Sequence, residues 1–526
     1  MVEICFDMNT LGGNKVNFLK KLLLHRITFV FVSILVQIVV LVWAVFKLDE
    51  YFVYFYGISV FISMLSVLAI TNSNSNPAYK IAWIIPILSL PVLGGLFYVF
   101  FGGSKLNRRT RKKMKYIALK SSEALSSKDD ILADIKDKNP IAGIQSTYIK
   151  DYAFCPPYDN TYVEYFPLGE DAYKVLIEEL KKAKHYIFLE YFIITEGFMW
   201  NSILDILIEK AKEGLDVRVM YDDVGCLLTL PEGYDKKLEK LGIKCSVFNP
   251  LKPFISFRLN NRNHRKIAVI DGITGFTGGF NLADEYINEY EKYGHWKDTA
   301  IMLKGDGVWS LTVMFLTIWD FQKGIDEDFS KFKNPLISEL LFNKNEYVQP
   351  FTDSPLDEEP VGEIVYLNLI NKAKKYVYIT TPYLIIGNEM VTALTSAAKG
   401  GIDVRIITPH IPDKRTVHEV SRSYYKTLIN SGVKIYEYLP GFIHSKSYIV
   451  DDEYAVVGTI NMDYRSLYLH FECGVWMYNC LSIQDIYSDF MATLERCKQI
   501  TLEETNNIKW YRTVLRLILR IFSPIM

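Results

Sequence analysis

The stretch NHRKIAVIDG, residues 263–272, places a histidine, a lysine and an aspartate at fixed positions along a short apolar run. IHSKSYIVDD, residues 443–452, repeats this skeleton in the second half of the chain. Both copies continue to a glycine and an asparagine, and both fit the pattern H-x-K-x4-D-x6-G-x-x-N. A pattern with this many fixed spacers rarely occurs twice by chance, so it indicates a duplicated domain.

The sequence around the two motifs is duplicated as well. AKHYIFLEYFII (183–194) resembles AKKYVYITTPYLII (373–386), and AKEGLDVRVMYD (211–222) resembles AKGGIDVRIITP (398–409). Within each half, amphipathic helical patterns such as residues 171–184 alternate with apolar strand patterns. This alternation predicts an α/β fold of two tandem halves, each a mainly parallel sheet flanked by helices, which together form a pseudo-dimer.

The geometry of a strand explains the spacing within each motif. A histidine and a lysine two residues apart on a strand point to the same face, whereas the aspartate five residues after the lysine points to the other. We therefore expect the aspartate to hold a loop or the backbone. The glycines allow a tight turn that returns the asparagine to the site. Each half then presents an imidazole, an ammonium group and a carboxamide.

Two such halves together form a pocket suited to a phosphodiester. The lysines and asparagines bind the non-bridging oxygens and stabilise the charge of a five-coordinate transition state. One histidine attacks phosphorus, and the other protonates the leaving alcohol and then deprotonates the incoming one. The candidate catalytic residues are His264, Lys266, Asp271, His444, Lys446 and Asp451, and the candidate substrate-binding residues are Asn281 and Asn461.

Each histidine also needs a partner for its second ring nitrogen. The repeat alignment offers Asp298 and Glu472, which both begin an apolar strand pattern after the asparagine, and we predict that these acids orient the histidines. Glu285 is a further acid nearby. We predict no metal ion in the site, because a protonated lysine is a poor ligand and repels a neighbouring cation.

Composition limits the remaining classes of function. The chain has 526 residues, enough for two or three domains, and a formal net charge of −1, so it lacks the global basic field typical of proteins that bind nucleic acid. The cysteines show no CxxC or zinc-site spacing, and we expect reduced thiols rather than disulfides. They are Cys5, Cys155, Cys226, Cys245, Cys473, Cys480 and Cys497.

Three apolar runs open the chain, at residues 27–46, 51–70 and 81–101, and each is long enough to cross a bilayer as a helix. Basic residues precede the first run, and a larger basic cluster at 105–115 follows the third. The positive-inside rule therefore places the body of the protein in the cytoplasm. Because both flanks are basic, two topologies stay open: a hairpin followed by a re-entrant segment, or three full spans.

The carboxy-terminal residues also favour contact with a membrane. IKWYRTVLRLILRIFSPIM places Arg512, Arg516 and Arg520 on one stripe of a helix that is otherwise covered by apolar side chains. This pattern favours an in-plane interfacial helix that contacts anionic lipids, and a helix docked on the protein's own core is the alternative. We divide the chain into a membrane domain (1–115), a first half (116–335), a second half (336–500) and an amphipathic helix (501–526).

The paired motifs resemble the signature of the phospholipase D superfamily, and the whole chain resembles the bacterial cardiolipin synthases within it. The amino-terminal stretch NPAYKIAWIIPILSLPVLGGLFYVFFG is similar to the membrane segment of that family. His470 stands where the resemblance leads us to expect asparagine, and Lys297 where we expect arginine. The stretches that carry the resemblance are NHRKIAVIDG, FTGGFNLADEY, GHWKDT, IHSKSYIVDD and VGTINMDYRSLYLHFE.

The resemblance implies a reaction. One phosphatidylglycerol forms a phosphohistidine-linked phosphatidyl-enzyme and releases glycerol, and a second phosphatidylglycerol accepts the phosphatidyl group to give cardiolipin. The resemblance favours His264 as the nucleophile and implies neither a nucleotide nor a metal. With the apolar runs, it predicts a multi-pass protein of the bacterial cell membrane, with a cytoplasmic catalytic domain and with phosphatidylglycerol and other anionic lipids as partners.

Three alternatives stay open. A phospholipase D-type hydrolase, or a phosphatidyltransferase with another acceptor, would use the same site. A nuclease is the second alternative, and the apolar runs and the near-zero net charge argue against it. A non-catalytic lipid-binding scaffold is the third, and the presence of two intact motifs argues against that.

Overall fold

The computed structural model describes residues 52–73, 76–90, 108–126, 129–251, 261–335, 342–343, 345–356 and 359–525, with a few isolated positions between 35 and 98. The chain divides into two compact units. One comprises residues 1–105, 249–261 and 518–526, and the other comprises residues 106–248 and 262–517. The second unit contains both motifs and all of the candidate site residues.

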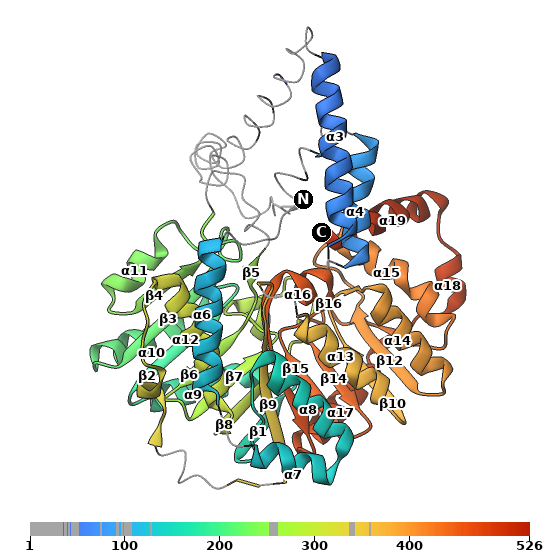
Figure 1. Cartoon of the computed structure of the whole chain (residues 1–526). Helices are drawn as coiled ribbons and strands as arrows, with labels where there is room; N and C mark the ends of the chain where they lie inside the picture. Colours follow the sequence, from blue (N-terminus) through green and yellow to red (C-terminus); the bar gives the residue numbers. More distant parts are fainter. Residues whose placement is uncertain are drawn as a thin grey trace, which may run out of the picture. The chain divides into compact units, whose positions relative to one another are not determined.

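The first half of this second unit is built on a seven-stranded sheet (Figure 1). The strand order is β1-β8-β7-β6-β2-β3-β4, in which β2, β3 and β4 run parallel and the other neighbours are antiparallel. The strands are β1 (Thr161–Phe166), β2 (Tyr186–Tyr191), β3 (Asp216–Asp222), β4 (Lys244–Phe248), β6 (Ile267–Ile270), β7 (Thr274–Gly278) and β8 (Ala300–Gly305).

The second half repeats this topology strand by strand. In its nine-stranded sheet, β9-β17-β15-β14-β10-β12-β13 matches the order of the first sheet, β18 (Cys497–Gln499) extends one edge, and β5 (Arg262–Asn263) from the first half pairs with β17. The matching strands are β9 (Tyr347–Asp353), β10 (Tyr376–Thr380), β12 (Asp403–Pro409), β13 (Lys434–Tyr438), β14 (Ser447–Val450), β15 (Tyr454–Gly458) and β17 (His470–Tyr478).

Both sheets are mixed, whereas the sequence pattern led us to expect mainly parallel sheets. The parallel part consists of β2-β3-β4 in one half and β10-β12-β13 in the other. The motifs enter as the hairpins β6–β7 and β14–β15, and a short turn joins only antiparallel strands. The motif thus adds an antiparallel segment to a parallel one. The duplicated α/β fold is confirmed, and the strand directions differ for this reason.

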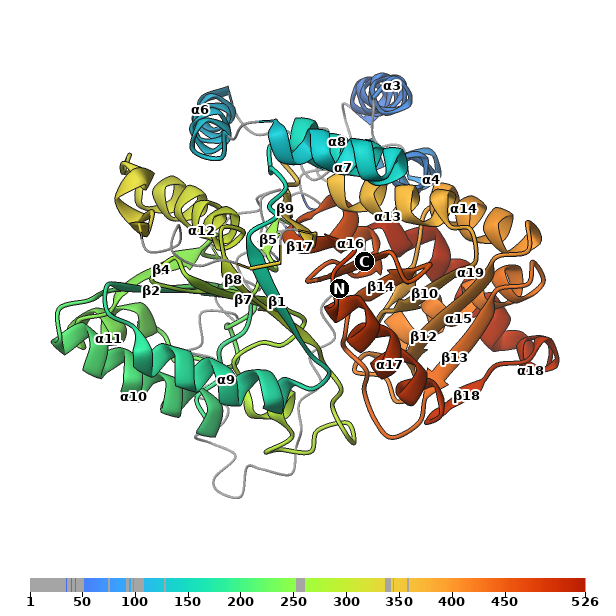
Figure 2. The ribbon, with the colours of Figure 1, turned by 90° about the horizontal axis from the view of Figure 1, so that it is seen from below.

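Helices cover both faces of each sheet (Figure 2). In the first half, α9, α10 and α11 lie on one face and α12 on the other; in the second half, α13 and α14 lie on one face and α17 on the other. The helices are α9 (Gly169–Lys182), α10 (Phe198–Lys212), α11 (Tyr234–Lys240), α12 (Val308–Lys323), α13 (Val361–Lys372), α14 (Asn388–Lys399), α15 (Arg415–Ile429), α16 (Tyr464–Tyr468) and α17 (Ser482–Leu494). Three further helices, α6 (Arg108–Ala124), α7 (Asp130–Lys138) and α8 (Pro140–Ala153), precede the first half.

Apolar side chains from the helices and the sheet form the core of the first half. Each fully buried leucine or isoleucine contributes about 1.5–3 kcal/mol relative to an exposed one, so these side chains stabilise the packing of the helices on the sheet. The core includes Leu176, Leu180, Ile203 and Leu207 from α9 and α10, and Ile187, Leu189, Val217 and Val219 from β2 and β3.

Two helices belong to the amino-terminal unit. α3 (Phe52–Thr71) covers the second predicted apolar run, and α4 (Pro77–Ser89) covers the start of the third. The first run and the end of the third lie outside the described residues, apart from isolated positions. Among the helices formed by described residues, none has both the length and the apolar character required to cross a membrane.

The carboxy-terminal residues form α18 (Leu502–Asn506) and α19 (Trp510–Phe522), and no residue of α19 is buried. The Nε atom of Arg516 lies 2.7 Å from Glu419 Oε2 of α15, which ties the helix to the second half by one ion pair. Trp510 and Leu517 are among the apolar side chains of α19 that stay exposed. The cysteines in the described part of the chain are all free thiols; Cys5 lies outside it.

The motif aspartates fasten each hairpin to the preceding part of its sheet. Asp271 accepts backbone N–H groups from residues 184–186 at 2.7–2.9 Å, and Asp451 makes the same three bonds to residues 374–376. Both aspartates have positive φ values, 53° and 58°, at the turn that closes the hairpin. The expectation that they hold backbone is confirmed. These bonds give both aspartates a backbone-holding role, and their place among the candidate catalytic residues stays a prediction.

This geometry predicts the effect of substituting Asp271. Asp271→Ala removes the acceptor of three N–H groups and puts alanine in a left-handed conformation, so it should lower the free energy of unfolding by about 2–4 kcal/mol. Asp271→Asn keeps one carbonyl oxygen and tolerates positive φ, so it should cost about half as much. Denaturant unfolding of the purified protein measures both. Equal losses for the two variants would contradict the assigned role.

Candidate active site

The two motif histidines lie at the junction between the two halves. β5, which directly precedes His264, pairs in parallel with the start of β17, and the backbone N–H of His264 donates to the Phe471 carbonyl at 2.9 Å. In the same way, the backbone N–H of His444 donates to the Lys297 carbonyl at 2.7 Å. Each histidine is thus hydrogen-bonded to the residue that directly precedes the orienting acid of the opposite half.

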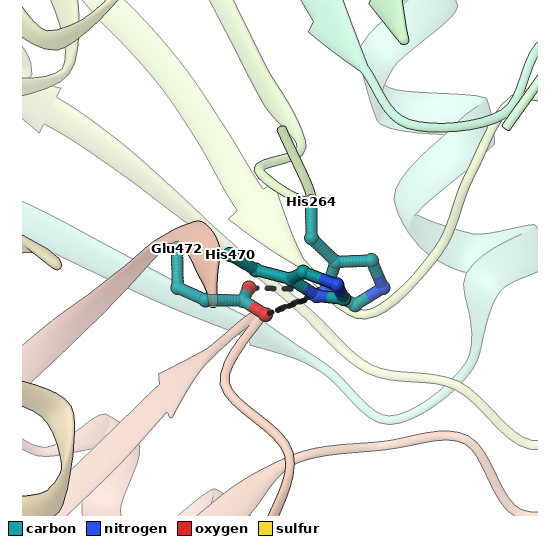
Figure 3. Close-up of side chains that lie close together, drawn as sticks. All are labelled: His264, His470 and Glu472. Atoms are coloured by element: carbon teal, nitrogen blue, oxygen red, sulfur yellow. Dashed lines mark hydrogen bonds and ion pairs between the residues drawn. The ribbon is translucent and has the colours of Figure 1, made fainter. Parts of the chain in front are cut away.

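Each orienting acid contacts the motif histidine of the opposite half. His264 Nδ1 lies 2.9 and 3.0 Å from the two carboxylate oxygens of Glu472, as Figure 3 shows, and His444 Nδ1 lies 2.7 Å from Asp298 Oδ2. Both acids are fully buried. The two predicted histidine–acid contacts are therefore present, and the structure adds that each acid comes from the half opposite to its histidine.

These contacts assign the protons of the imidazoles. A carboxylate accepts a hydrogen bond, so Nδ1 carries the proton in both histidines and Nε2 keeps its lone pair. Lys446 Nζ also lies 2.9 Å from His444 Nδ1, but a protonated Nδ1 cannot accept from an ammonium group. We therefore assign the hydrogen bond of Lys446 to the carbonyl of His444, which it also contacts. The arrangement leaves the Nε2 atoms available as nucleophile and base.

The motif lysines are buried beside their histidines. Lys266 Nζ donates to the backbone carbonyl of His264 at 2.5 Å, and Lys446 makes the equivalent bond. Burial lowers the pKa of Lys266 to about 7, assisted by the charge of Lys446, and lowers the pKa of Lys446 to about 8. Glu472 and Asp298 oppose this shift in both lysines. An anionic substrate would favour the ammonium form of both.

Burial and the neighbouring cations also keep the histidines neutral. The pKa of His264 falls well below its usual range because of burial and the charges of Lys266 and Lys446. Burial and Lys446 lower the pKa of His444 to about 4, against the opposing effect of Asp298. Although burial alone would raise it, the pKa of Asp298 is lowered by its charged neighbours. Neutral imidazole is the form that a nucleophile or a general base requires.

The two motif asparagines differ in their contacts. Asn281 accepts the backbone N–H of Ile193 at 3.0 Å and donates to the Tyr286 hydroxyl at 2.8 Å, so its amide is engaged within the first half. The amide oxygen of Asn461 is buried and has no hydrogen-bond partner among the described residues. Asn461 is therefore the asparagine with unused hydrogen-bonding capacity in the site, an asymmetry that the matching motifs did not predict.

Glycine is required where the two halves approach closely. A Cβ atom on Gly279 would overlap the carboxylate of Asp298 and would lie 3.0 Å from the carbonyl oxygen of His444. The further acid Glu285 bonds Lys292 at 3.0 Å, whereas Glu472 and Asp298 are the acids that contact the motif histidines. It is therefore separate from the histidine–acid pairs in this structure.

Two ring side chains that the motif analysis did not assign lie against the histidines. The ring centroids of Trp296 and His444 are 5.5 Å apart, and those of His470 and His264 are 5.6 Å apart. Trp296 and His470 each stand two residues before an orienting acid, so a residue-by-residue comparison of the repeats would have found both. Phe192 also packs against His264, and Tyr286 and Phe442 pack against His444.

Comparison with known proteins agrees with this arrangement. The family model described as the phospholipase D-like domain of cardiolipin synthase matches residues 176–301 and again residues 366–496. A second model, described as a phospholipase D-nuclease amino-terminal segment, matches residues 59–103. The cardiolipin synthase of Halalkalibacterium halodurans is 36% identical over 86% of this chain and 90% of its own length. The chain belongs to the cardiolipin synthase family of the phospholipase D superfamily.

Three further proteins are similar to this chain over most of their own length. A cardiolipin synthase of Geobacillus sp. (strain WCH70) is 34% identical over 89% of this chain and 94% of its own length. A protein of Streptococcus mutans is 44% identical over 88% of this chain and 99% of its own length. Among solved structures, the phosphatidylserine synthase of Haemophilus influenzae shares the fold: its TM-score is 0.53 at 17% identity, and the match covers 69% of this chain and 93% of that one.

The depressed lysine pKa values predict the pH dependence of catalysis. The free enzyme loses ammonium charge as the pH rises through about 7 and 8, so kcat/KM for a phospholipid substrate should fall between about pH 7 and pH 9. The bound phosphodiester anion raises both lysine pKa values, so kcat should fall only at higher pH. Initial rates across this pH range measure both kcat/KM and kcat. A kcat/KM that stays constant up to about pH 9 would contradict the assignment.

Proposed function

We propose that this protein is a cardiolipin synthase that transfers the phosphatidyl group of one phosphatidylglycerol to a second one. The observation that carries the proposal is the pair of histidine–carboxylate contacts, each with a buried motif lysine bonded to the backbone of its histidine. Two histidines with free Nε2 atoms suit a two-step transfer, in which the phosphatidyl group waits on the protein between donor and acceptor. The family of the chain supports the same conclusion.

The first step forms a covalent intermediate. The Nε2 lone pair of His264 attacks phosphorus, and the bond from phosphorus to the glycerol oxygen breaks. His444, which takes a proton from solvent on Nε2 when the substrate anion binds, gives that proton to the glycerol oxygen. His444 is neutral in the free protein because of burial and Lys446, and the incoming phosphodiester anion raises its pKa toward the range of a proton donor. Lys266 and Lys446 stabilise the charge on the non-bridging oxygens.

The second step reverses these roles for a new alcohol. His444, now neutral, accepts the proton of a primary hydroxyl of the second phosphatidylglycerol, whose oxygen attacks phosphorus. The bond from phosphorus to His264 Nε2 breaks, and cardiolipin leaves. Glu472 holds the His264 ring in the required orientation in both steps, and Asp298 does so for His444. The proposed reaction uses neither a metal nor a nucleotide.

The proposal places the protein at the cell membrane with its catalytic halves in the cytoplasm. The apolar runs, the basic cluster that follows them and the match of residues 59–103 to the amino-terminal family model support this placement. The cytoplasmic placement of the catalytic halves predicts that a reporter fused after residue 526 is exposed on the cytoplasmic side. Protease protection in spheroplasts measures this, and an extracellular reporter would contradict it.

The proposal is tested by lipid product analysis. Membranes containing the protein are incubated with labelled phosphatidylglycerol in the absence of nucleotide and added metal, and we expect cardiolipin and glycerol. His264→Ala should abolish formation of both products, and His444→Ala should reduce the rate by about 10²–10⁴-fold. Phosphatidic acid as the sole product would instead identify a hydrolase. Turnover of another lipid without formation of cardiolipin would support the same two-step mechanism with a different substrate.

The exposed helix α19 is proposed to bind the surface of anionic lipid. Two arginines near a membrane contribute about 1 kcal/mol each, so Arg512→Ser together with Arg520→Ser should weaken the affinity for anionic lipid by about 30-fold and raise the anionic lipid fraction that gives half-maximal activity. Mixed micelles of variable composition measure this fraction. Arg405→Ser is the control, because Arg405 pairs with Asp403 at 2.7 Å within β12. An unchanged lipid dependence in the double variant would contradict the proposal.

A further inference from the structure

The proposed nucleophile, His264, and two buried side chains beside it form a compact set of metal-ligand atoms. The ligand atoms of His264, His470 and Glu472 all lie within 4.8 Å of one another. His264 Nδ1 is 2.9 Å from Glu472 Oε1, and His470 Nδ1 is 3.7 Å from the same oxygen. Tetrahedral zinc with bonds of about 2.0–2.1 Å separates its ligand atoms by about 3.3 Å, which lies between these two distances.

The imidazole of His470 has unused coordination capacity. It is 9% exposed, and neither of its ring nitrogens has a hydrogen-bond partner among the described residues. Figure 3 shows its ring next to the His264 ring and beside the Glu472 carboxylate. The 3.7 Å separation from Glu472 is too long for a hydrogen bond. A buried imidazole that makes no hydrogen bond is costly, and a bound cation would satisfy one of its nitrogens.

The other half of the protein provides an internal comparison. Trp296 occupies the position equivalent to His470, because it stands two residues before Asp298 and lies against His444 at almost the same ring distance. Its indole nitrogen is 3.5 Å from Asp298 Oδ2 and is a donor only, with no lone pair for a metal ion. The site around His444 therefore has two ligand side chains, and the site around His264 has three.

We propose that His264, His470 and Glu472 form an inhibitory binding site for a divalent transition metal ion, with Zn²⁺ as the ion of best fit. Two imidazoles and one carboxylate, with water as the fourth ligand, are a ligand set that Zn²⁺ adopts in proteins. Zinc tolerates small changes of ligand angle because it has no geometric preference from its d electrons. The histidine set also excludes Mg²⁺ and Ca²⁺, which prefer oxygen ligands.

Metal binding would inactivate His264, the nucleophile proposed above. The inhibitory part of the inference therefore rests on the proposed function. The ion takes the place of the proton on His264 Nδ1, and this proton leaves to solvent. Its positive charge withdraws electron density from the ring, so Nε2 becomes a weaker nucleophile, and Glu472 is drawn into coordination. The nearby ammonium group of Lys266 opposes the cation. Binding is therefore reversible and inhibitory, unlike that of a permanent structural zinc.

The test measures binding and inhibition separately on the full chain in detergent micelles. Zn²⁺ titration by calorimetry gives the affinity, and Co²⁺ as a probe reports tetrahedral coordination by its visible absorbance. His470→Asn and His470→Phe remove the third ligand, and a thermal melt of each confirms folding. His410→Asn is the matched control, because His410 also bonds a buried glutamate, Glu437, at 2.8 Å. Cardiolipin formation with and without Zn²⁺ gives the inhibition constant.

We expect one Zn²⁺ per wild-type chain, at least tenfold weaker binding and inhibition in both His470 variants, no such change in His410→Asn, and recovery of activity with a chelator. Equal Zn²⁺ affinity in wild type and in a folded His470 variant would overturn the proposal. So would a wild-type protein that binds no Zn²⁺. If the protein binds Zn²⁺ through His470 but makes no cardiolipin, the metal site stands and the proposed function fails.

Discussion

The site depends on the hydrogen bond between the buried carboxylate of each half and the motif histidine of the other half. Glu472 of the second half holds His264 of the first, and Asp298 of the first half holds His444 of the second. A buried carboxylate without a hydrogen-bonded partner is strongly unfavourable, and each half supplies the imidazole partner for the acid of the other half. The same contacts that join the halves also set the tautomer of each imidazole, and assembly and catalysis therefore use the same bonds.

The rest of the fold serves to bring these four groups together. The hairpins β6–β7 and β14–β15 place each lysine beside its own histidine, and Asp271 and Asp451 fasten the hairpins to the preceding strands. The pairing of β5 with β17 places His264 next to Glu472 of the opposite sheet. The cost of burying the lysines appears in their lowered pKa values, and an anionic phosphodiester would restore their charge.

The duplication made much of this arrangement predictable from the sequence. Two copies of one motif indicated the tandem α/β halves, the shared face of histidine and lysine, the backbone role of Asp271, and the two orienting acids. Strand direction was not predictable from apolar patterns, because a hairpin and a βαβ unit give similar runs of residues. The contact of Glu472 and Asp298 with the histidine of the opposite half was not predictable either. A repeat alignment shows which positions are equivalent, but it does not show which positions are in contact. The difference between Asn281 and Asn461 was hidden too, because it lies in a backbone contact: the Asn281 amide oxygen accepts the N–H of Ile193, and that of Asn461 has no hydrogen-bond partner among the described residues.

The crossed pairing is tested most directly by locating the covalent intermediate in two acid variants. Protein is mixed with labelled phosphatidylglycerol and quenched, and the peptides that carry His264 and His444 are analysed by mass spectrometry. Our account predicts an adduct on His264 that Glu472→Gln prevents, and that persists longer in Asp298→Asn because His444 then activates the acceptor poorly. An adduct on His264 that is lost in Asp298→Asn and kept in Glu472→Gln would mean that each acid serves its own half, and would contradict the account.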